Sequence, residues 1–469
     1  MEGTGMLSDV PVKQDGRKLW QYLSTAAASI LSIGVGTALA WTSPVFALLR
    51  KEESFLKLSE TEESWVGSLL AIGSIVGAIP AGKIADKIGR KKTILSLAAP
   101  FLLSWTIIVF AKTVIILCIA RFIVGIGVGA SCVLVPTYIS EIAEASVRGT
   151  LGAIFQLFLT AGIVLAFVMG SILDYTGFAV VCGIIEIIFL VCFFWMPESP
   201  VWLVGQSRKQ EASIAMTILR GDVYDPSGEI SSMEREVGKA SSKKSSVFDL
   251  IRTSGTRKAT LACLAGMAFQ QLSGVNGVIF YTSQIFQDAG SSMDPDLASI
   301  LVATVQMIMA GVAALIVDRA GRKPLLIISC ALSSMSLVAI GVYFQLKDSG
   351  NDVITIGWLP LSSLVIFMIA FSIGLGPIPW MLTGELYTAE LKGTATSLAV
   401  MVNWFLVFLV TKSFPQMKTT LGPAISFWIF AGIMGGATVF TLFFVPETKG
   451  KSMQAIQNEL NGIRISKPV

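Results

Sequence analysis

The sequence predicts an all-α integral membrane protein whose twelve transmembrane helices form two parallel six-helix repeats. Hydrophobic residues make up 53% of the 469-residue chain and charged residues only 14%, whereas an average soluble domain carries about 25% charged residues. A helix needs about 20 mainly apolar residues to cross a bilayer, and apolar runs of this kind recur twelve times along the chain. Short charged motifs also recur in the same order in both halves.

The expected spans determine which side of the membrane each end of the chain occupies. An even number of spans places both termini on the same side. Most of the 35 Lys and Arg residues fall in segments on that side, and such segments usually face the cytoplasm. The spans are expected at residues 20–49, 64–82, 93–111, 113–139, 149–170, 177–196, 259–286, 297–317, 325–346, 358–384, 394–411 and 424–446.

One long polar segment divides the spans six and six. It is rich in Ser, Lys, Glu and Arg, and its residues 211–219 carry apolar side chains at helical spacing. Short amphipathic helices are therefore predicted there. The expected regions are a cytoplasmic N-terminal tail (1–18), an N-terminal six-helix bundle (19–196), a cytoplasmic linker (197–258), a C-terminal six-helix bundle (259–446) and a cytoplasmic C-terminal tail (447–469).

The composition argues against several classes of function. The sequence has no histidine, which removes His-based acid–base catalysis and His metal ligation. Its six cysteines lie in apolar runs without CxxC spacing, which argues against a zinc site or a disulfide framework. The net charge of +4 is small and its charges are scattered, which argues against a nucleic-acid partner. We therefore expect no enzyme, no metal site and no cofactor.

Three charged motifs indicate an internal duplication. GKIADKIGRKK, which starts at Gly82 after the second span, is similar to DRAGRK, which starts at Asp318 after the eighth. A glutamate followed seven residues later by a basic residue occurs after the fourth span and again after the tenth. PES after the sixth span, from Pro197, recurs as PET after the twelfth, from Pro446. Parallel six-span repeats of this kind occur in transporters whose substrate site lies at the midplane between the halves.

Further motifs identify a family. The chain contains RFIVG from Arg121, PTYISE, QQLSGVN from Gln270, GPIPW from Gly376, and PETKG. With these motifs it resembles the sugar-porter branch of the major facilitator superfamily from the first span to Gly450. Within this branch, the segments WTSP, IFQDAG and GWLP are most similar to insect facilitated trehalose transporters. The resemblance implies the major facilitator fold and sugar uniport by alternating access around a midplane site.

The repeated charges at the cytoplasmic span ends predict a gate. Charged side chains at the membrane interface avoid most of the cost of the bilayer centre, about 2.5–3.5 kcal/mol each on insertion scales. Ion pairs among these side chains would close the inner face, as the family resemblance also implies. For any single charged residue, the alternative is that it only marks the cytoplasmic side of the membrane and takes no part in a gate. The predicted gate residues are Asp86, Arg90, Glu141, Arg148 and Glu198 in the first half, and Asp318, Arg322, Glu385, Lys392 and Glu447 in the second.

Amides and a tryptophan within the spans are the candidate substrate ligands. Sugar hydroxyls both donate and accept hydrogen bonds, and an aromatic face suits the C–H surface of the ring. Amides in membrane spans also join helices to one another, which is the alternative role. The resemblance implies sugar contact for Gln156, Gln270, Gln271, Asn276, Trp380 and Asn403, and for Gln306, where hexose carriers often have Asn.

Two further features refine the predicted site. Six residues advance a straight helix by about 600°, so Gln270 and Asn276 share a site only if the helix breaks, and Gly274 and Gly277 offer a break. By family analogy Tyr281 is an outer-gate residue, with an interfacial aromatic anchor as the alternative. Ser372 stands where hexose carriers usually have glutamate, which is compatible with a larger sugar.

The acids in the spans bear on energy coupling. Proton-linked sugar porters usually carry an acid in the first span, but residues 29–44 contain none, which favours uniport. Arg121 in span four and Glu186 in span six lie at similar depth, so we expect them to form an intramembrane ion pair.

Several alternatives remain open at this stage. One alternative is a hexose carrier or a proton-coupled sugar symporter. Another, of a different class, is a membrane protein that senses sugar without transporting it. The expected partners are a small-molecule sugar and the lipid bilayer, with the monomer as the functional unit and the plasma membrane as its location.

Overall fold

The computed structural model describes residues 17–461 except 53, 145, 222–223, 241–245, 291–292, 388 and 452. The described chain is helical and contains no strand. Within the described ranges, twelve helical segments are long and apolar enough to cross a membrane, which confirms the predicted number of spans. Most of the predicted N-terminal tail and residues 462–469 of the predicted C-terminal tail lie outside the described residues.

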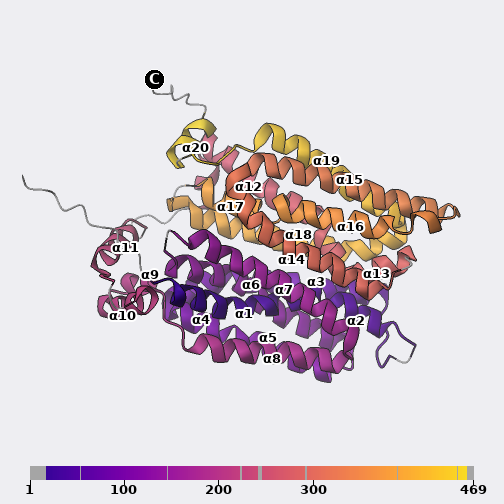
Figure 1. The fold of residues 1–469 in the computed structure, drawn as a ribbon, viewed down its shortest axis with the longest axis horizontal. Helices are drawn as coiled ribbons and strands as arrows, with labels where there is room; N and C mark the ends of the chain where they lie inside the picture. Colours follow the sequence, from indigo (N-terminus) through magenta and orange to yellow (C-terminus); the bar gives the residue numbers. More distant parts are fainter. Residues whose placement is uncertain are drawn as a thin grey trace, which may run out of the picture.

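The first six spans form one bundle, coloured indigo to magenta in Figure 1. Its first span is interrupted at Trp41, where α1 ends and α2 begins. The helices are α1 (Leu19–Ala40), α2 (Thr42–Leu49), α3 (Glu60–Ile88), α4 (Arg90–Ser96), α5 (Ala98–Phe110), α6 (Val114–Ile142), α7 (Arg148–Ile172) and α8 (Tyr175–Phe194).

The last six spans form a second bundle, coloured pink through orange to yellow, alongside the first (Figure 1). The predicted eleventh span, 394–411, proves much longer, because its helix continues through Pro415 to Leu421. The helices are α12 (Ser254–Leu272), α13 (Val275–Ala289), α14 (Pro295–Ala320), α15 (Arg322–Asp348), η2 (Ile354–Ile356), α16 (Leu359–Ala370), the π-helix η3 (Phe371–Leu375), α17 (Ile378–Glu385), α18 (Ala389–Leu421), α19 (Pro423–Phe444) and α20 (Met453–Leu460).

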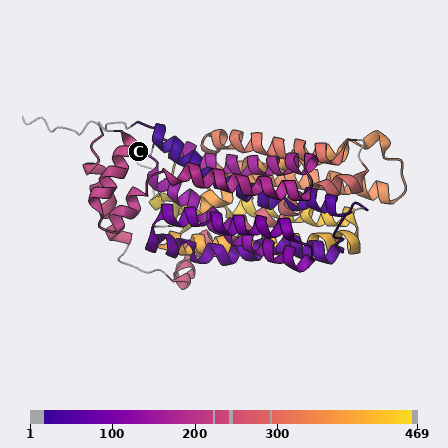
Figure 2. The ribbon, with the colours of Figure 1, turned by 90° about the horizontal axis from the view of Figure 1, so that it is seen from below.

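The polar segment between the bundles forms α9 (Pro200–Gly205), α10 (Lys209–Arg220), α11 (Ser227–Ala240) and η1 (Val247–Ile251). Helix α10 is amphipathic, as predicted for residues 211–219, and buries one apolar side that includes Ala212, Met216 and Leu219. Figures 1 and 2 show α9–α11 outside the bundles at one end, and α20 lies at this same end in Figure 1. We call this the linker end and the opposite end, where α2 and α13 meet, the far end.

Small residues allow some helices to pack with their backbones close together. A Cβ atom on Gly73 of α3 would lie 2.1 Å from the carbonyl oxygen of Phe122 of α6, and one on Gly36 of α1 would lie 2.0 Å from that of Leu159 of α7. Close backbone approach at small residues is a usual basis of helix association in membranes. Large apolar side chains on the outside, such as Phe110 at 73% exposed, suit contact with lipid tails.

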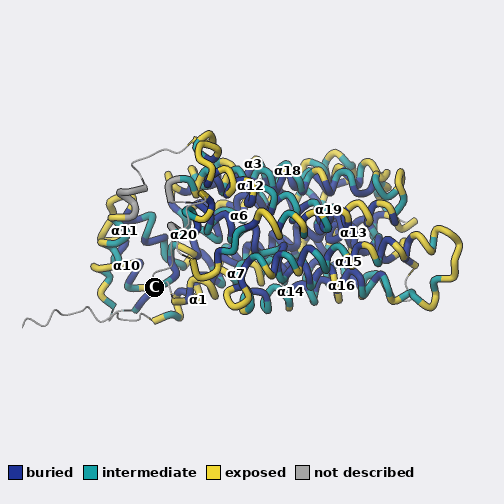
Figure 3. Tube along the Cα trace, turned by 90° about the horizontal axis from the view of Figure 1, so that it is seen from above, coloured by how far each residue is buried: buried dark blue, intermediate teal, exposed yellow. Residues whose placement is uncertain are grey.

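The two bundles are in contact at the far end. Helix α2 packs against α13 and α3 against α18. Ser43 Oγ donates to Ser283 Oγ at 3.2 Å, and Thr42 Oγ1 donates to the carbonyl oxygen of Phe280 at 3.2 Å. Buried residues continue along the facing sides of the helices, and exposed residues gather in the end loops and the linker helices (Figure 3).

Candidate functional site

Two interrupted helices of the second bundle build the centre of the candidate site. The seventh span breaks between α12 and α13 at Gly274, whose φ of +83° is left-handed, a conformation that glycine adopts without steric cost. Gly277 continues as regular helix, so the predicted break occurs at Gly274 alone. The tenth span passes through η3 before α17 begins. Interrupted helices expose backbone polar groups and are typical of transporter sites.

The break brings four of the predicted amides together. Asn276 Nδ2 donates to Gln271 Oε1, and Gln271 Nε2 donates to Gln270 Oε1 at 3.2 Å. Asn403 of α18 donates from Nδ2 to the same Gln270 oxygen at 2.8 Å. Gln270, Gln271 and Asn403 are buried and Asn276 is half-buried. These four residues, which we call the amide cluster, offer both donors and acceptors in one place.

Gln270 has a second role that the sequence does not reveal. Its Nε2 donates to the carbonyl oxygens of Leu375 and Gly376, both at 2.7 Å. These carbonyls lie where η3 ends, so their regular helical partners are missing. Gln270 is therefore committed on both its nitrogen and its oxygen and acts to hold the tenth span in place. Gln271 and Asn276 retain more capacity to bind a sugar hydroxyl.

The other three predicted ligands lie outside the hydrogen-bonded cluster. Trp380, near the start of α17, is half-buried. Gln306 of α14 is buried, and Gln156 of α7 is exposed. Helices α7 and α14 pack against each other from opposite bundles, so Gln156 and Gln306 come from the helices on either side of the boundary between the bundles.

Tyr281 lies between the two bundles at the far-end side of the amide cluster. Its side chain is 1% exposed, which does not fit an interfacial anchor. The ring packs at 5.8 Å from that of Phe46 in the first bundle and 5.7 Å from that of Phe414 in the second. The hydroxyl donates to the carbonyl oxygen of Thr411 at 3.3 Å. Tyr281 itself has non-helical backbone angles, so α13 bends where this ring inserts.

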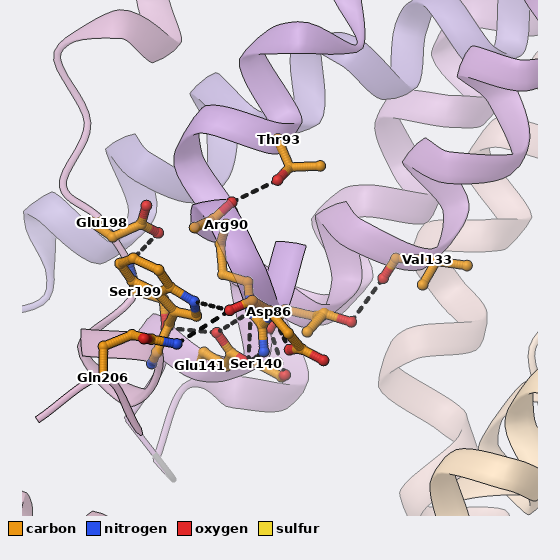
Figure 4. A network of polar contacts seen from close by, with 12 residues as sticks. Asp86, Arg90, Thr93, Val133, Ser140, Glu141, Glu198, Ser199 and Gln206 are labelled. Atoms are coloured by element: carbon orange, nitrogen blue, oxygen red, sulfur yellow. Dashed lines mark hydrogen bonds and ion pairs between the residues drawn. The ribbon is translucent and has the colours of Figure 1, made fainter. Parts of the chain in front are cut away.

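A charged cluster lies at the linker end of the first bundle (Figure 4). Arg90 forms ion pairs with Asp86 at 2.5 Å and with Glu141 at 3.0 Å. Glu198 accepts from the backbone N–H of Lys91 at 2.9 Å. Ser199 Oγ donates to Glu141 Oε2 at 2.5 Å. The motifs after spans two, four and six thus meet in one network, which we call the N cluster.

The second bundle repeats this arrangement in its C cluster. Arg322 forms ion pairs with Asp318 at 2.8 Å and Glu385 at 2.9 Å. Glu447 accepts from the backbone N–H of Arg322 at 3.0 Å, and Thr448 Oγ1 donates to Glu385 Oε2 at 2.5 Å. The roles of Ser199 and Thr448 were not predicted from the sequence, although a hydroxyl residue directly follows the glutamate in both PES and PET.

Two predicted gate residues do not pair with these acids. Arg148, the first residue of α7, donates instead to the carbonyl oxygen of Ala143 at 3.4 Å. Lys392 forms no ion pair with a described residue; its Nζ lies beside Gly384. Within the described part of the chain, the N and C clusters close within each bundle, and no ion pair joins the bundles at the linker end.

The predicted Arg121–Glu186 ion pair is wrong. Arg121 donates from Nη1 to the carbonyl oxygen of Ala38 at 2.7 Å and from Nε to that of Val66 at 3.2 Å, and its guanidinium lies 5.3 Å from the centre of the Trp41 ring. Ala38 lies in the last turn of α1, where carbonyl groups lose their intrahelical partners. Arg121 is therefore held by backbone oxygens.

Glu186 is fully buried, and neither of its carboxyl oxygens has a hydrogen-bond partner among the described residues. Its Oε1 points at α1, where a Cβ on Gly34 would lie only 1.9 Å away. An unpaired carboxylate in such surroundings is costly, and the neutral, protonated form costs far less. Glu186 thus stands apart from Arg121 and packs with its carboxyl group against the first span.

Fold and site together define a twelve-helix transporter with the major facilitator fold. The family described as Sugar (and other) transporter matches residues 24–460, so the chain belongs to this family and is a transporter rather than an enzyme. It is 39% identical over 445 residues to facilitated trehalose transporter Tret1 of Polypedilum vanderplanki, covering 94% of this chain and 88% of that protein. It is 38% identical over 453 residues to Tret1 of Bombyx mori, covering 96% and 89%.

Solved structures show the same fold. The proton:xylose symporter XylE bound to 6-bromo-6-deoxy-D-glucose superposes with a TM-score of 0.76 at 24% identity, covering 94% of this chain and 99% of that one. XylE from E. coli in a partially occluded inward open conformation gives a TM-score of 0.77 at 23% identity, covering 93% and 100%. The chain is accordingly a multi-pass membrane protein with the architecture of a sugar transporter.

Proposed function

We propose that this protein is a facilitated transporter of trehalose that works by alternating access around the amide cluster. The observation that carries the proposal is the meeting of Gln271, Asn276 and Asn403 at the break of the seventh span, beside the boundary between the bundles. The names of the relatives in Polypedilum vanderplanki and Bombyx mori support the proposal, because the alignments with these proteins cover more than nine-tenths of this chain. Trp380, Gln306 and Gln156 complete the proposed sugar site.

The orientation follows from the distribution of basic residues. We place the linker end, with both termini and the N and C clusters, in the cytoplasm, and the far end outside the plasma membrane. In this orientation the bundles touch on the extracellular side, and Tyr281 closes the site from outside. In the transport cycle the two six-helix bundles then rock about the amide cluster. The functional unit is a single monomer.

The first test is substrate transport. Oocytes expressing the protein should take up radiolabelled trehalose, and trehalose preloaded inside should accelerate uptake by counterflow. Preference for glucose over trehalose would support the hexose carrier, and sugar binding without flux would support the sensor. Both outcomes would refute the proposal.

Gln271→Ala tests the amide cluster. Losing one hydrogen bond to a sugar hydroxyl costs about 1 kcal/mol, so the half-saturation concentration should rise about fivefold at unchanged surface expression. Gln416→Ala is the matched control, because Gln416 is an exposed amide on α18 outside the amide cluster. Its loss should leave uptake unchanged. If Gln271→Ala transports normally, the amide serves helix packing.

Glu186 supports one competing function, proton-coupled symport, because it is a buried acid with no hydrogen-bond partner in the part of the chain that the structure describes. In the uniport proposal it stays protonated throughout the cycle. Uptake should then be indifferent to an imposed pH gradient, and Glu186→Gln should retain transport. Accumulation of sugar above equilibrium under an inward proton gradient, abolished by Glu186→Gln, would replace uniport by symport.

A further inference from the structure

Four charged residues gather at the far end, where sequence analysis assigned no gate of this kind. Arg50, directly after α2, holds Glu63 of α3 by two hydrogen bonds, from Nε to Oε1 at 2.8 Å and from Nη2 to Oε2 at 2.5 Å. Lys418 of α18 forms an ion pair with Asp288 of α13. The first pair belongs to the first bundle and the second pair to the second bundle.

A single neutral side chain joins these two pairs. With the amide of Gln284 oriented so that its oxygen faces the cations, that oxygen accepts from Arg50 at 2.6 and 2.9 Å and from Lys418 at 3.1 Å. This orientation satisfies both the oxygen and the nitrogen of the amide. Gln284 of α13 therefore connects a cation of the first bundle to a cation of the second.

The surroundings make these contacts stronger than ordinary surface pairs. The side chain of Glu63 is 2% exposed and that of Lys418 is 9% exposed, so water screens them poorly. Burial lowers the pKa of Arg50, but its hydrogen bond to Glu63 and the negative charges of Glu63 and Asp288 outweigh burial and raise that pKa above its ordinary value. Arg50 therefore responds to the charge of an acid on the opposite bundle.

A second bridge lies one layer deeper along α18. Lys412 Nζ donates to Ser64 Oγ of α3 at 2.7 Å and lies 4.0 Å from the centre of the Trp65 ring. Both partners belong to the first bundle, whereas Lys412 belongs to the second. The far end thus has two lysines that reach toward the first bundle, one of them through Gln284.

We propose that Gln284, with Arg50 and Lys418, forms a polar latch that holds the extracellular ends of the bundles together and sets the balance between inward-open and outward-open states. Opening this end breaks the Gln284 and Lys412 bridges together with the Ser43–Ser283 and Thr42–Phe280 hydrogen bonds, but leaves Arg50–Glu63 and Lys418–Asp288 intact within their own bundles. The cost of opening therefore depends on the bridging side chains. This inference rests on the proposed transport function for its kinetic consequences.

Gln284 permits a test in both directions. Gln284→Ala removes the bridge, so the outward-open state should gain population; Gln284→Glu places a carboxylate between two cations, so that state should lose population. Because apparent affinity scales with the fraction of the competent state, the half-saturation concentration for sugar outside should fall about threefold in Gln284→Ala and rise about threefold in Gln284→Glu. Efflux should change in the opposite sense.

Gln287 supplies the matched controls. It lies one turn further along α13 and is exposed, so Gln287→Ala and Gln287→Glu carry the same chemical changes without touching the latch and should leave both half-saturation concentrations unchanged. Equal shifts in the Gln287 and Gln284 variants, shifts of the same sign in the two Gln284 variants, or no shift in either would overturn the proposal.

A readout without sugar separates failure of the latch from failure of the transport proposal. Ser43→Cys places a thiol at the buried contact with Ser283, where a membrane-impermeant maleimide added outside reacts only when the far end opens. The protein without Ser43→Cys gives the background labelling of the native cysteines. Relative to Ser43→Cys alone, labelling should accelerate about threefold when Gln284→Ala is added and should slow when Gln284→Glu is added. These rates would support the latch even if trehalose were not the substrate, and unchanged rates would refute it.

Discussion

The N cluster and the C cluster share one plan but differ in how their acids are held. Arg90 contacts both carboxyl oxygens of Glu141, whereas Arg322 contacts only Oε1 of Glu385. The side chain of Glu141 is 12% exposed and that of Glu385 is 28% exposed. The repeated motifs therefore set the ion pairs, but burial is set by the chain that follows each motif.

The covering segments explain this difference. In the first bundle, α9 follows the PESP motif, and its Trp202 Nε1 and the adjoining Gln206 Nε2 both donate to the carbonyl oxygen of Asp86. In the second bundle, the chain after PETKG contributes Lys449, which donates to the carbonyl oxygen of Arg319. A helix that places an indole over one cluster excludes more water than a single lysine over the other.

The largest expected effect comes from removing the central arginines. Arg90→Ala leaves Glu141 buried without its cation, and Arg322→Ala does the same to the more exposed Glu385. Breaking a fully buried pair costs about 3–5 kcal/mol; we expect roughly 3 kcal/mol for Arg90→Ala and less for Arg322→Ala. Thermal unfolding of the purified protein in detergent measures both. Equal losses would show that the covering segments do not matter.

A smaller effect should reverse the order of the two clusters. Glu385 Oε2 receives its hydrogen bond from Thr448, whereas Glu141 Oε2 is also held by Arg90 at 3.1 Å. Thr448→Ala should therefore cost about 1 kcal/mol and Ser199→Ala less, since a typical hydrogen bond contributes about that much. Unfolding of Thr448→Ser should match the unsubstituted protein. A larger loss in Ser199→Ala would contradict this assignment of partners.

The sequence predicts these clusters well because each motif occurs twice, with its acids and bases at span ends that a six-helix repeat brings together. It also predicts the twelve spans, since length and hydropathy suffice for them. The amides at Gln270 and Asn276 could be placed in one site because a glycine between them allowed a break. In each case the sequence pattern itself restricts where the residues can lie in space.

Other features could not be predicted from the sequence, because they depend on backbone carbonyl groups that lack helical partners in the folded structure. Equal depth of Arg121 and Glu186 says nothing about the direction in which each side chain points around its helix, so the expected pair is wrong. Arg121 donates to a carbonyl oxygen at the end of α1, and Gln270 donates to those at the end of η3. The far-end latch joins Gln284 of α13, Lys418 of α18 and Arg50, directly after α2, without a repeated motif.

The smallest expected effect concerns pH and the glutamates that follow spans six and twelve. Burial raises the pKa of Glu198, and the backbone N–H groups of Lys91 and Ser199 only partly oppose it. Burial acts in the same direction on Glu447, but four backbone N–H groups, including those of Lys449 and Arg322, outweigh it and lower that pKa. The two equivalent acids therefore shift in opposite directions.

The signs of these shifts give opposite contributions to stability. A lowered pKa means that ionised Glu447 stabilises the fold above its ordinary pKa, and that this stabilisation is lost as the pH falls through the lowered value. A raised pKa means that folded Glu198 binds its proton more tightly than the unfolded chain does, so ionisation costs stability at neutral pH and acidification relieves that cost. At pH 7, Glu447→Gln should therefore lower the unfolding temperature more than Glu198→Gln. Between pH 7 and 4 the difference should shrink, because folded Glu198 protonates within this range and recovers the stability that its ionisation cost, whereas Glu447 loses its contribution only as the pH falls toward its lowered pKa. A difference that stays constant over this range would mean that both glutamates act only through their hydrogen-bond geometry, and that the clusters differ in burial but not in charge.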